Sequence, residues 1–490
     1  MDGGSGTIAW HLDAFRRETA DIDIPAFATA DPADRPAEER PGTVVNSAGE
    51  SEGYAGGLSL IGQNGFIGIS VSTYANDYGL PGPEESEEED GGGEPLIAPG
   101  PFIELEQTRW DLRGEYNMSG AFEKARIRVG RNNYEHSEIE PTGDVATLFE
   151  NDAWEGRFEL VHAPIGRWRG AVGLQLNDRD FSAVGAEAFI VPTRTHSYGV
   201  FLVEEQTHDW GRIELGARVE SLEHEPSGNL SSYDDTAISL AAGLIWDFAQ
   251  DYDFSANLSR SERNLDIAEL YSNGAHLATG LFEVGLFADG GRQAQREVAN
   301  NLDISLHHHT DRISWQINAF YNRVSDYTFR TETAAIEDGL PIAPYRQQDA
   351  DFYGYEAEVT LALGGSTSPW DMRMFTDYVR GNTDVGDLPR IQPRRFGTQL
   401  DYSGVRWSAG VQAVFHAKQD DVSSFPTDSF IMLNANLALK IGNNGPFVWN
   451  LFVRTSNLLD EDARRSTSFR AAFVPLPGRS FHAGLRARFN

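Results

Sequence analysis

Histidine and carboxylate side chains are the residues of this sequence that could bind a metal ion, and two runs of them are conspicuous. One is "HHH" at 307–309, and the other is the acidic run "PEESEEEDGGGE" at 83–94. Imidazole suits Zn²⁺ and related transition metals, whereas carboxylates alone favour hard cations. The chain contains no cysteine, so it has neither a thiolate ligand nor a disulfide. We find no Ser–His–Asp set, P-loop or paired-carboxylate motif and therefore do not expect an enzyme.

Neither run predicts a complete site by itself. The acidic run lies in a long loop, where it would be a solvated, self-repelling surface or a collector of cations. The three histidines fall at a tight turn. Adjacent residues of a strand point to opposite faces, so three consecutive imidazoles cannot all converge on one ion.

The overall composition excludes several classes of protein. The chain has 490 residues, a net charge of −34 and a sequence pI of about 4.6, so nucleic acid is not an expected partner. No run of 18 apolar residues predicts a transmembrane helix. The first residues, "MDGGSGTIAW", lack the basic and apolar regions of a signal peptide. That start fits a cytoplasmic protein, and it equally fits a sequence without its N-terminal part.

The elements that must position these side chains are predicted by a period of two. In "RISWQINAFYN" the odd positions from Ile313 to Tyr321 are apolar and the even positions are polar, interrupted by Phe320. The last segment, "RSFHAGLRARFN", alternates in the same way. Such alternation predicts strands with one apolar and one polar face. We expect about 20 strands of roughly 10 to 15 residues, long enough to span a membrane.

The connections between these strands alternate in length. Tight turns are predicted at 61–66, 207–212, 308–312, 402–406 and 442–447, and long loops at about 20–52, 76–102, 183–194, 264–293, 329–347, 381–393 and 458–475. Short turns at one end and long loops at the other are typical of an outer-membrane barrel. The first strand, at about 7–19, would run up and the last one down.

The predicted fold class is therefore all-β, a transmembrane antiparallel β-barrel, because a sheet in hydrocarbon must close to satisfy its backbone. A soluble propeller is the alternative, but its strands are short, and we find no repeat of about 40 to 50 residues. A passive, porin-like channel would have the same wall. We expect a monomer in contact with outer-membrane lipid.

Several segments resemble TonB-dependent outer-membrane receptors. The segment "ELYSNGAHLATGLFEVG" (269–285) resembles the signature of that family, and downstream blocks follow in the family's order, among them "ADFYGYEAEV", "LPRIQPRRFG" and "RTSNLLDEDARRSTSF". Upstream, "WHLDAFRRETADIDIP", "GFIGISVSTYANDYGLPG" and "RVGRNNYEHSE" look like the zinc-type, ZnuD-like branch. The resemblance covers almost the whole of 1–490.

The resemblance implies a 22-stranded barrel that holds an N-terminal plug domain preceded by a TonB box. The sequence matches from the third strand of such a receptor onward, so we expect a barrel portion without signal peptide, plug, TonB box and first two strands. Two smaller departures are a missing proline, since Asn264 and Leu265 follow Arg263, and the terminal Asn490 after Phe489.

The resemblance also implies a metal site. The zinc-type branch holds its ion with plug residues and two barrel residues, which map onto Glu138 in "NNYEHSE" and His276 in "SNGAH". In the strand at about 121–138, even-numbered residues face the lumen, which adds His136 to the candidates. These side chains lie at the extracellular end and suit Zn²⁺, although two such ligands leave a tetrahedral site incomplete.

The function implied is uptake of a scarce metal, most readily zinc, driven by the TonB–ExbB–ExbD complex. No cofactor is expected, since the metal ion or metal chelate would be cargo. The acidic run replaces the histidine-rich loop of zinc-type receptors, which leaves an iron-siderophore ligand as the alternative.

Overall fold

The computed structural model describes residues 1–490 except 38, 83–99, 289–292, 366, 442–446 and 490. Its main element is one sheet of 25 strands, of which twenty have nine residues or more. In chain order these twenty are β2 (Ile8–Thr19), β5 (Gly49–Gly62), β6 (Gly65–Gly79), β7 (Phe102–Asn117), β8 (Phe122–Ile139), β9 (Val145–His162), β10 (Trp168–Gly185), β11 (Thr193–His208), β12 (Gly211–Pro226), β13 (Tyr233–Ala249), β14 (Tyr252–Arg263), β17 (Glu297–His309), β18 (Ile313–Arg330), β20 (Leu340–Leu363), β21 (Trp370–Thr383), β23 (Arg395–Ser403), β24 (Trp407–His416), β25 (Phe430–Ile441), β26 (Phe447–Ser456) and β27 (Ser480–Phe489).

The remaining elements are short. The sheet also contains β1 (Asp2–Ser5), β15 (Asn273–His276), β16 (Leu281–Val284), β19 (Ile336–Glu337) and β22 (Gly386–Asp387), while β3 (Ile22–Asp23) and β4 (Thr43–Val44) pair separately. One helix, α1 (Ile267–Tyr271), is present in the described residues. No helix of the described part of the chain is long and apolar enough to cross a membrane.

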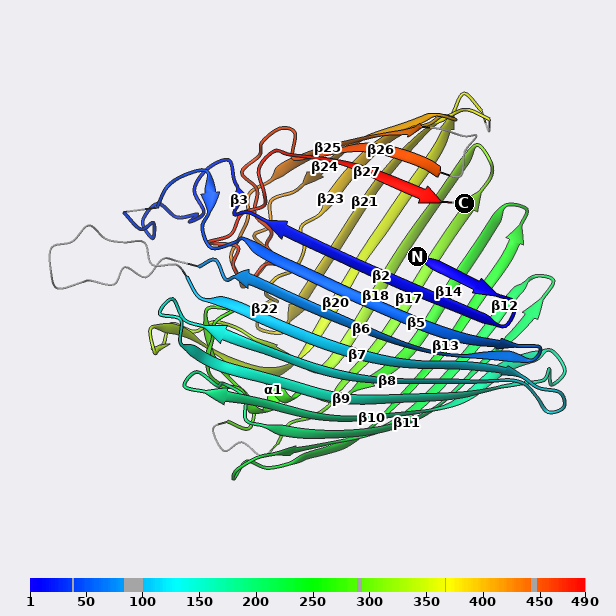
Figure 1. Cartoon of the computed structure of the whole chain (residues 1–490), viewed down its shortest axis with the longest axis horizontal. Coiled ribbons are helices and arrows are strands. Elements are labelled where there is room, and N and C mark those ends of the chain that lie inside the picture. Colours follow the sequence, from blue (N-terminus) through cyan, green and yellow to red (C-terminus); the bar gives the residue numbers. More distant parts are fainter. Residues whose placement is uncertain (38, 83–99, 289–292, 366, 442–446, 490) are drawn as a thin grey trace.

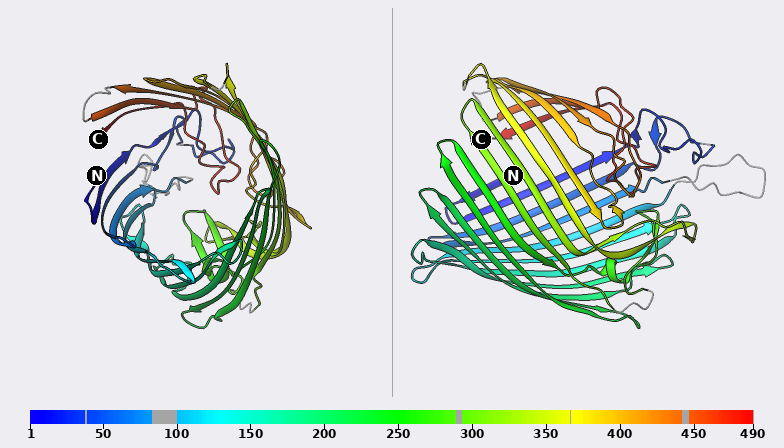
Figure 2. Two further views of the ribbon diagram at one scale, coloured as in Figure 1. Left: turned by 90° about the vertical axis from the view of Figure 1, so that its right-hand side faces the viewer. Right: turned by 180° about the vertical axis from the view of Figure 1, so that it is seen from behind.

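The long strands follow one another as an antiparallel meander that curls into a tilted ring (Figures 1 and 2). Short turns join them at one end, here called the turn end, toward which β27 also runs. The opposite end, the loop end, carries the longer connections and α1. The alternation of short and long connections is therefore confirmed. The predicted turn at 442–447 lies almost entirely outside the described residues.

The ring is open between its first and last strands. Among the described residues, β27 pairs with β26 alone, and β1 pairs with β2 alone. β1 and β27 both run toward the turn end, so pairing these two strands would give a parallel pair in an otherwise antiparallel wall. β1 covers only residues 8–11 of β2. The expected closed barrel is therefore a curved, unclosed sheet in this structure. At the loop end, hydrogen bonds from the Gly478 amide to Asp23 O and from the Ala30 amide to Ala472 O join the flanking loops, both 2.8 Å.

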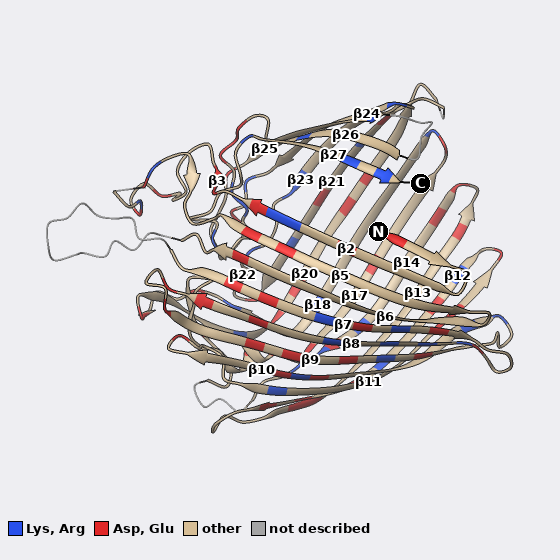
Figure 3. Ribbon diagram, in the orientation of Figure 1, with Lys and Arg blue, Asp and Glu red and all other residues tan. Residues whose placement is uncertain are grey.

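The two faces of the wall differ in polarity as the period of two predicts. On one face, Trp10 of β2 and Leu58 of β5 lie opposite each other, and both are exposed. The other face carries charged pairs such as Arg157 with Glu159, at 2.6 Å, and charged side chains recur along the strands (Figure 3). Phe149 shares the parity of these charges and packs on Phe189 of the connection between β10 and β11. The loop-end connections fold into the ring (Figure 2). The polar face is therefore the inner face, and the apolar face is the outer face.

The structure differs from the sequence-based expectation in strand length. Several strands have 16 to 18 residues, and β20 has 24, whereas roughly 10 to 15 were expected. The structure also explains why Phe320 interrupts the alternation of apolar and polar residues. Phe320 lies on the inner face and packs over Gly354 of the neighbouring strand, where a Cβ atom would come within 2.7 Å of the phenyl ring.

Candidate functional site

The signature segment forms a compact unit at the loop end, between β14 and β17. Its helix α1 begins with a capping box: the Asp266 carboxylate accepts a hydrogen bond from the Ala268 amide, at 3.1 Å, and Glu269 accepts one from the Asp266 amide, at 2.8 Å. Glu269 also accepts two hydrogen bonds from Arg263 at the end of β14, both 2.9 Å. These bonds satisfy the amides of the first turn and fix a very short helix to the wall.

A hairpin follows the helix and carries His276. Strands β15 and β16 pair in antiparallel fashion, and β16 adds in parallel to the loop end of β20. The Asn273 amide donates to Phe189 O, at 2.7 Å, in the connection between β10 and β11. His276, which we expected in a loop, is thus the last residue of a short strand tied to two neighbouring connections.

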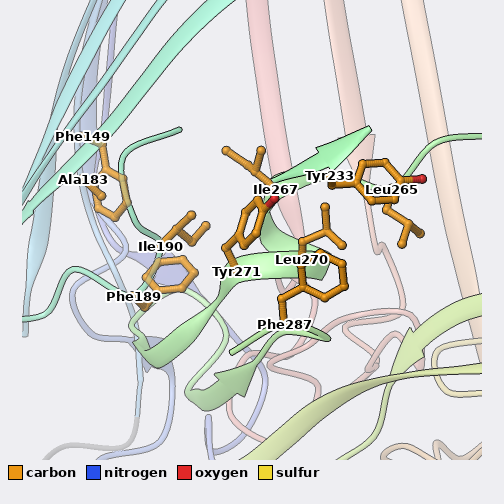
Figure 4. Close-up of a cluster of buried hydrophobic side chains, with 10 residues drawn as sticks. All are labelled: Phe149, Ala183, Phe189, Ile190, Tyr233, Leu265, Ile267, Leu270, Tyr271 and Phe287. Atoms are coloured by element: carbon orange, nitrogen blue, oxygen red, sulfur yellow. The ribbon is translucent and has the colours of Figure 1, made fainter. Parts of the chain in front are cut away.

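A hydrophobic cluster holds this unit against the wall (Figure 4). Leu270 and Tyr271 of α1 are almost fully buried within it. Burial of these apolar side chains stabilises the folded arrangement of the loop end. The buried members of the cluster are Phe149, Ala183, Phe189, Ile190, Tyr233, Leu265, Ile267, Leu270, Tyr271 and Phe287.

His276 is oriented by a buried carboxylate. Its Nδ1 lies 2.6 Å from Oε1 of Glu283, a residue that is 1% exposed. Arg330 forms an ion pair with Glu283, and Thr279 and Tyr345 donate hydrogen bonds to it at 3.0 and 3.3 Å. A carboxylate held in this way only accepts hydrogen bonds. The proton of His276 is therefore on Nδ1, and Nε2 keeps its lone pair.

The environment also keeps His276 uncharged. Burial, together with the positive charges of Arg330 and Arg470, lowers the pKa of His276 to about 4. A neutral imidazole is the form that binds metal ions. An imidazole whose Nδ1–H is held by a carboxylate is also the usual arrangement of a metal-ligating histidine.

The structure links His136 to His276 through two phenyl rings. The His136 ring stacks on Phe149 and the His276 ring stacks on Phe189, each with 4.4 Å between centroids, and the two phenyl rings are 6.1 Å apart. These four side chains form a continuous row of rings at the loop end. Within the described part of the chain, Nδ1 of His136 is buried without a hydrogen-bond partner.

Glu138 is the third predicted residue and lies two positions beyond His136 on the same face of β8. Its side chain is 5% exposed, and its backbone position is between Ile103 of β7 and Thr147 of β9. A carboxylate in such surroundings requires a counter-charge or a proton. All three predicted ligands thus belong to one region of the loop end, although they come from separate segments.

These side chains do not complete a metal site. No group of three or more His, Cys, Asp or Glu side chains in the described residues could hold a metal ion by itself. The arrangement offers imidazole nitrogens and one carboxylate, which is a partial set for Zn²⁺ or Cu²⁺. The acidic run at 83–94, predicted as a cation collector, lies outside the described residues.

The run "HHH" is at the turn end, as predicted, and its side chains alternate between faces. His307 and His309 approach Asp253, with Nδ1 to carboxylate oxygen distances of 2.7 and 3.6 Å. His308 stacks on Tyr252, with 4.3 Å between ring centroids. The expectation that three consecutive imidazoles do not converge is confirmed.

The sequence reasoning missed a cationic and aromatic patch near His276. Phe469, which is 47% exposed, lies close to the guanidinium groups of Arg330 and Arg390, which are 4.8 and 4.1 Å from its ring centroid. Arg470 donates to the carbonyl oxygens of Leu277, Ala278 and Pro81. Burial lowers the pKa of Arg390 and of Arg470. These residues come from the end of β18 and from two connections, and no spacing in the sequence brings them together.

Comparison with known proteins identifies the family. Residues 46–458 match the family model "TonB dependent receptor-like, beta-barrel". The chain belongs to this family. It is a family of outer-membrane receptors and transporters, not enzymes. The expected TonB-dependent receptor family and the expected all-β, antiparallel class of fold are therefore confirmed.

Solved structures of such receptors share the fold at low identity. The structure titled copper transporter OprC aligns with a TM-score of 0.79 and 16% identity, over 98% of this chain and 78% of that one. The FrpB iron transporter from Neisseria meningitidis aligns with a TM-score of 0.75 and 13% identity, over 99% and 78%. A mutant of the ferric enterobactin receptor PfeA from Pseudomonas aeruginosa, in a complex with enterobactin, aligns with a TM-score of 0.72 and 11% identity. The alignment covers 99% of this chain and 77% of that one.

Proposed function

We propose that this member of the TonB-dependent receptor family imports a scarce transition metal and that zinc is its first candidate. The observation that carries the proposal is the row of rings, which links His136 and His276 at the loop end through Phe149 and Phe189, from segments far apart in sequence. Glu138, buried on the same face as His136, adds an anionic ligand. Copper is the competing ion, because imidazole binds Cu²⁺ even more strongly.

Each residue has a defined part in this proposal. His276 binds through Nε2, since Glu283 holds its Nδ1–H. His136 supplies the second imidazole, and Glu138 supplies charge that is balanced when the cation arrives. The rest of the coordination shell comes from water or from another segment of the receptor. No covalent bond changes during binding and passage, and energy would come from the TonB–ExbB–ExbD complex that serves this family.

The binding test compares variants of the purified protein in detergent. We expect His276→Gln and Glu138→Gln each to weaken Zn²⁺ binding by at least about 10-fold in a competition titration with a zinc chelator. His416→Gln is the matched control, because His416 also lies at the loop end of a strand and stacks on a phenyl ring, that of Phe430, at 4.3 Å. Unchanged Zn²⁺ and Cu²⁺ affinity in both test variants would refute the metal site.

A second candidate cargo, an anionic metal chelate such as an iron siderophore, is favoured by the patch around Phe469. The guanidinium group of Arg390 beside the exposed ring of Phe469 would bind a planar, negatively charged ligand by ion pairing and stacking. Here Arg390→Met should weaken binding of a ferric catecholate while Zn²⁺ binding stays the same. The opposite pattern, loss of zinc binding alone on substitution of His276, would favour the free ion.

A further inference from the structure

A second group of metal-binding side chains lies at the turn end of the inner face, at the opposite end of the strands from His276. His307 and His309 occupy alternate positions of β17, so their side chains point to the same face about 7 Å apart along the strand. Asp253 is the register partner of His307 on the neighbouring strand β14. Alternate histidines on a strand can share one ion, which consecutive ones cannot.

One carboxylate orients the imidazole of His307 and lies near that of His309. Nδ1 of His307 lies 2.7 Å from Oδ1 of Asp253, and Nδ1 of His309 lies 3.6 Å from Oδ2 of the same group. Because an ionised carboxylate accepts protons and does not donate them, it favours the tautomer with hydrogen on Nδ1. The Nε2 atom of His307 is then unprotonated, as a metal ion requires. His309 lies too far from this carboxylate for a hydrogen bond, and its side chain is 68% exposed.

The middle histidine has different surroundings. His308 stacks on Tyr252 and lies 5.9 Å from the ring of Trp315, on the face opposite His307 and His309. Its Nδ1 is 3.0 Å from the carbonyl oxygen of Asp251. The run therefore divides into two inner-face imidazoles that share an acidic partner and one imidazole packed among aromatic rings.

We propose that His307 and His309 form a two-imidazole site for a late divalent transition metal, with Asp253 as the positioning residue and water completing the shell. The affinity should follow the general order for nitrogen ligands, with Cu²⁺ bound more tightly than Ni²⁺ or Zn²⁺. Both side chains are accessible, since His307 is 32% and His309 68% exposed. An ion that crosses the inside of the ring would meet this site on the periplasmic side.

This inference does not depend on the cargo proposed for the loop end. The experiment accordingly uses a His136→Gln, His276→Gln background, in which the loop-end imidazoles are absent. Cu²⁺ is titrated into this protein in detergent, and its bound fraction is followed by calorimetry and by the nitrogen couplings in the electron paramagnetic resonance spectrum.

We expect the background protein to bind one Cu²⁺ with two coupled imidazole nitrogens. Adding His307→Gln and His309→Gln should remove that spectrum and weaken Cu²⁺ binding by at least 10-fold, whereas adding His308→Gln should leave both unchanged. Asp253→Asn should weaken binding by roughly 10-fold with the two-nitrogen spectrum retained.

Two results would overturn the proposal. One is the same Cu²⁺ affinity with and without His307 and His309. The other is an equal loss on substitution of His308, which would mean that the substitutions disturb the end of β17 as a whole. Heat-modifiable migration on gels verifies that every variant has folded.

Discussion

The loop end and the wall of this molecule are stabilised in different ways. The loop end contains the hydrophobic cluster around α1, and Leu270, Tyr271 and Glu283 are almost fully buried there. In the wall, by contrast, many large apolar side chains of the outer face are exposed, for example Leu258 at 61% and Leu485 at 61%. The wall therefore depends on backbone pairing and on its surroundings, whereas the loop end depends on side-chain packing.

The contrast indicates where specificity lies. A strand of the wall can exchange one apolar outer residue for another without changing its neighbours, because only the period of two must be kept. The residues around His276 have no such freedom, since each one contacts several connections. Substitutions should therefore have large effects at the loop end and small effects in the wall.

The largest effect is expected for Glu283→Ala. This change leaves Arg330, which is 7% exposed, without its acidic partner and removes the acceptor for His276. Breaking a buried ion pair from one side costs about 3–5 kcal/mol. Hydrogen exchange of residues 266–287 should accelerate while exchange in the wall stays slow.

A double variant sharpens this result. Glu283→Leu combined with Arg330→Met removes both charges and should recover most of the lost protection. Equal protection in Glu283→Ala and in the unchanged protein would mean that the loop end is not organised around this pair.

Leu270→Ala should have the next largest effect and destabilise the loop end by about 2–5 kcal/mol. Leu270 is 0% exposed, so its truncation leaves a cavity beneath α1. Limited proteolysis at the loop end is the measurement. The matched control is Leu258→Ala on the outer face of β14, whose leucine has little protein around it. If the control variant became as sensitive as Leu270→Ala, the proposed difference between the two regions would be wrong.

The wall was largely predictable from the sequence and the loop end was not. A period of two is a local property, so the strand expected at about 121–138 is found at Phe122–Ile139, and the one expected at about 7–19 is found at Ile8–Thr19. Helix α1 has five residues, too few for a helical period to be recognised. The parallel pairing of β16 with β20 joins distant segments, and no local pattern encodes it.

The candidate site was predictable only in part for the same reason. Strand parity indicated that His136 and Glu138 share a face, and the family resemblance indicated His276. Phe149 and Phe189, which lie between the two histidines, and Arg330, which pairs with Glu283, are identified only by tertiary contacts. The assignment of these side chains to a metal remains a prediction.

A smaller effect is expected from alkaline pH, again confined to the loop end. Burial raises the pKa of Tyr271 above its usual value of about 10, and its hydroxyl donates to Ser231 O at 3.1 Å. Since the folded state holds this proton more tightly, its contribution is complete below about pH 10 and is lost as the pH rises toward the folded-state pKa. Each pH unit in this range lowers the free energy of unfolding by up to about 1.4 kcal/mol.

The measurement is hydrogen exchange or proteolysis of the loop end between pH 9 and 11. Tyr271→Phe should remove most of this pH dependence at the cost of one hydrogen bond. A pH dependence that survives in Tyr271→Phe would assign the transition to another group.

The smallest effect is expected for an ion pair of the wall, Glu358 with Arg373, which join at 2.5 Å across β20 and β21. Their side chains are 28% and 42% exposed, so water already stabilises both charges. Arg373→Met should therefore change the free energy of unfolding in detergent by about 0–1 kcal/mol. A loss above about 2 kcal/mol would show that charged pairs of the inner face hold the strands together, and the wall would then depend on specific side chains as the loop end does.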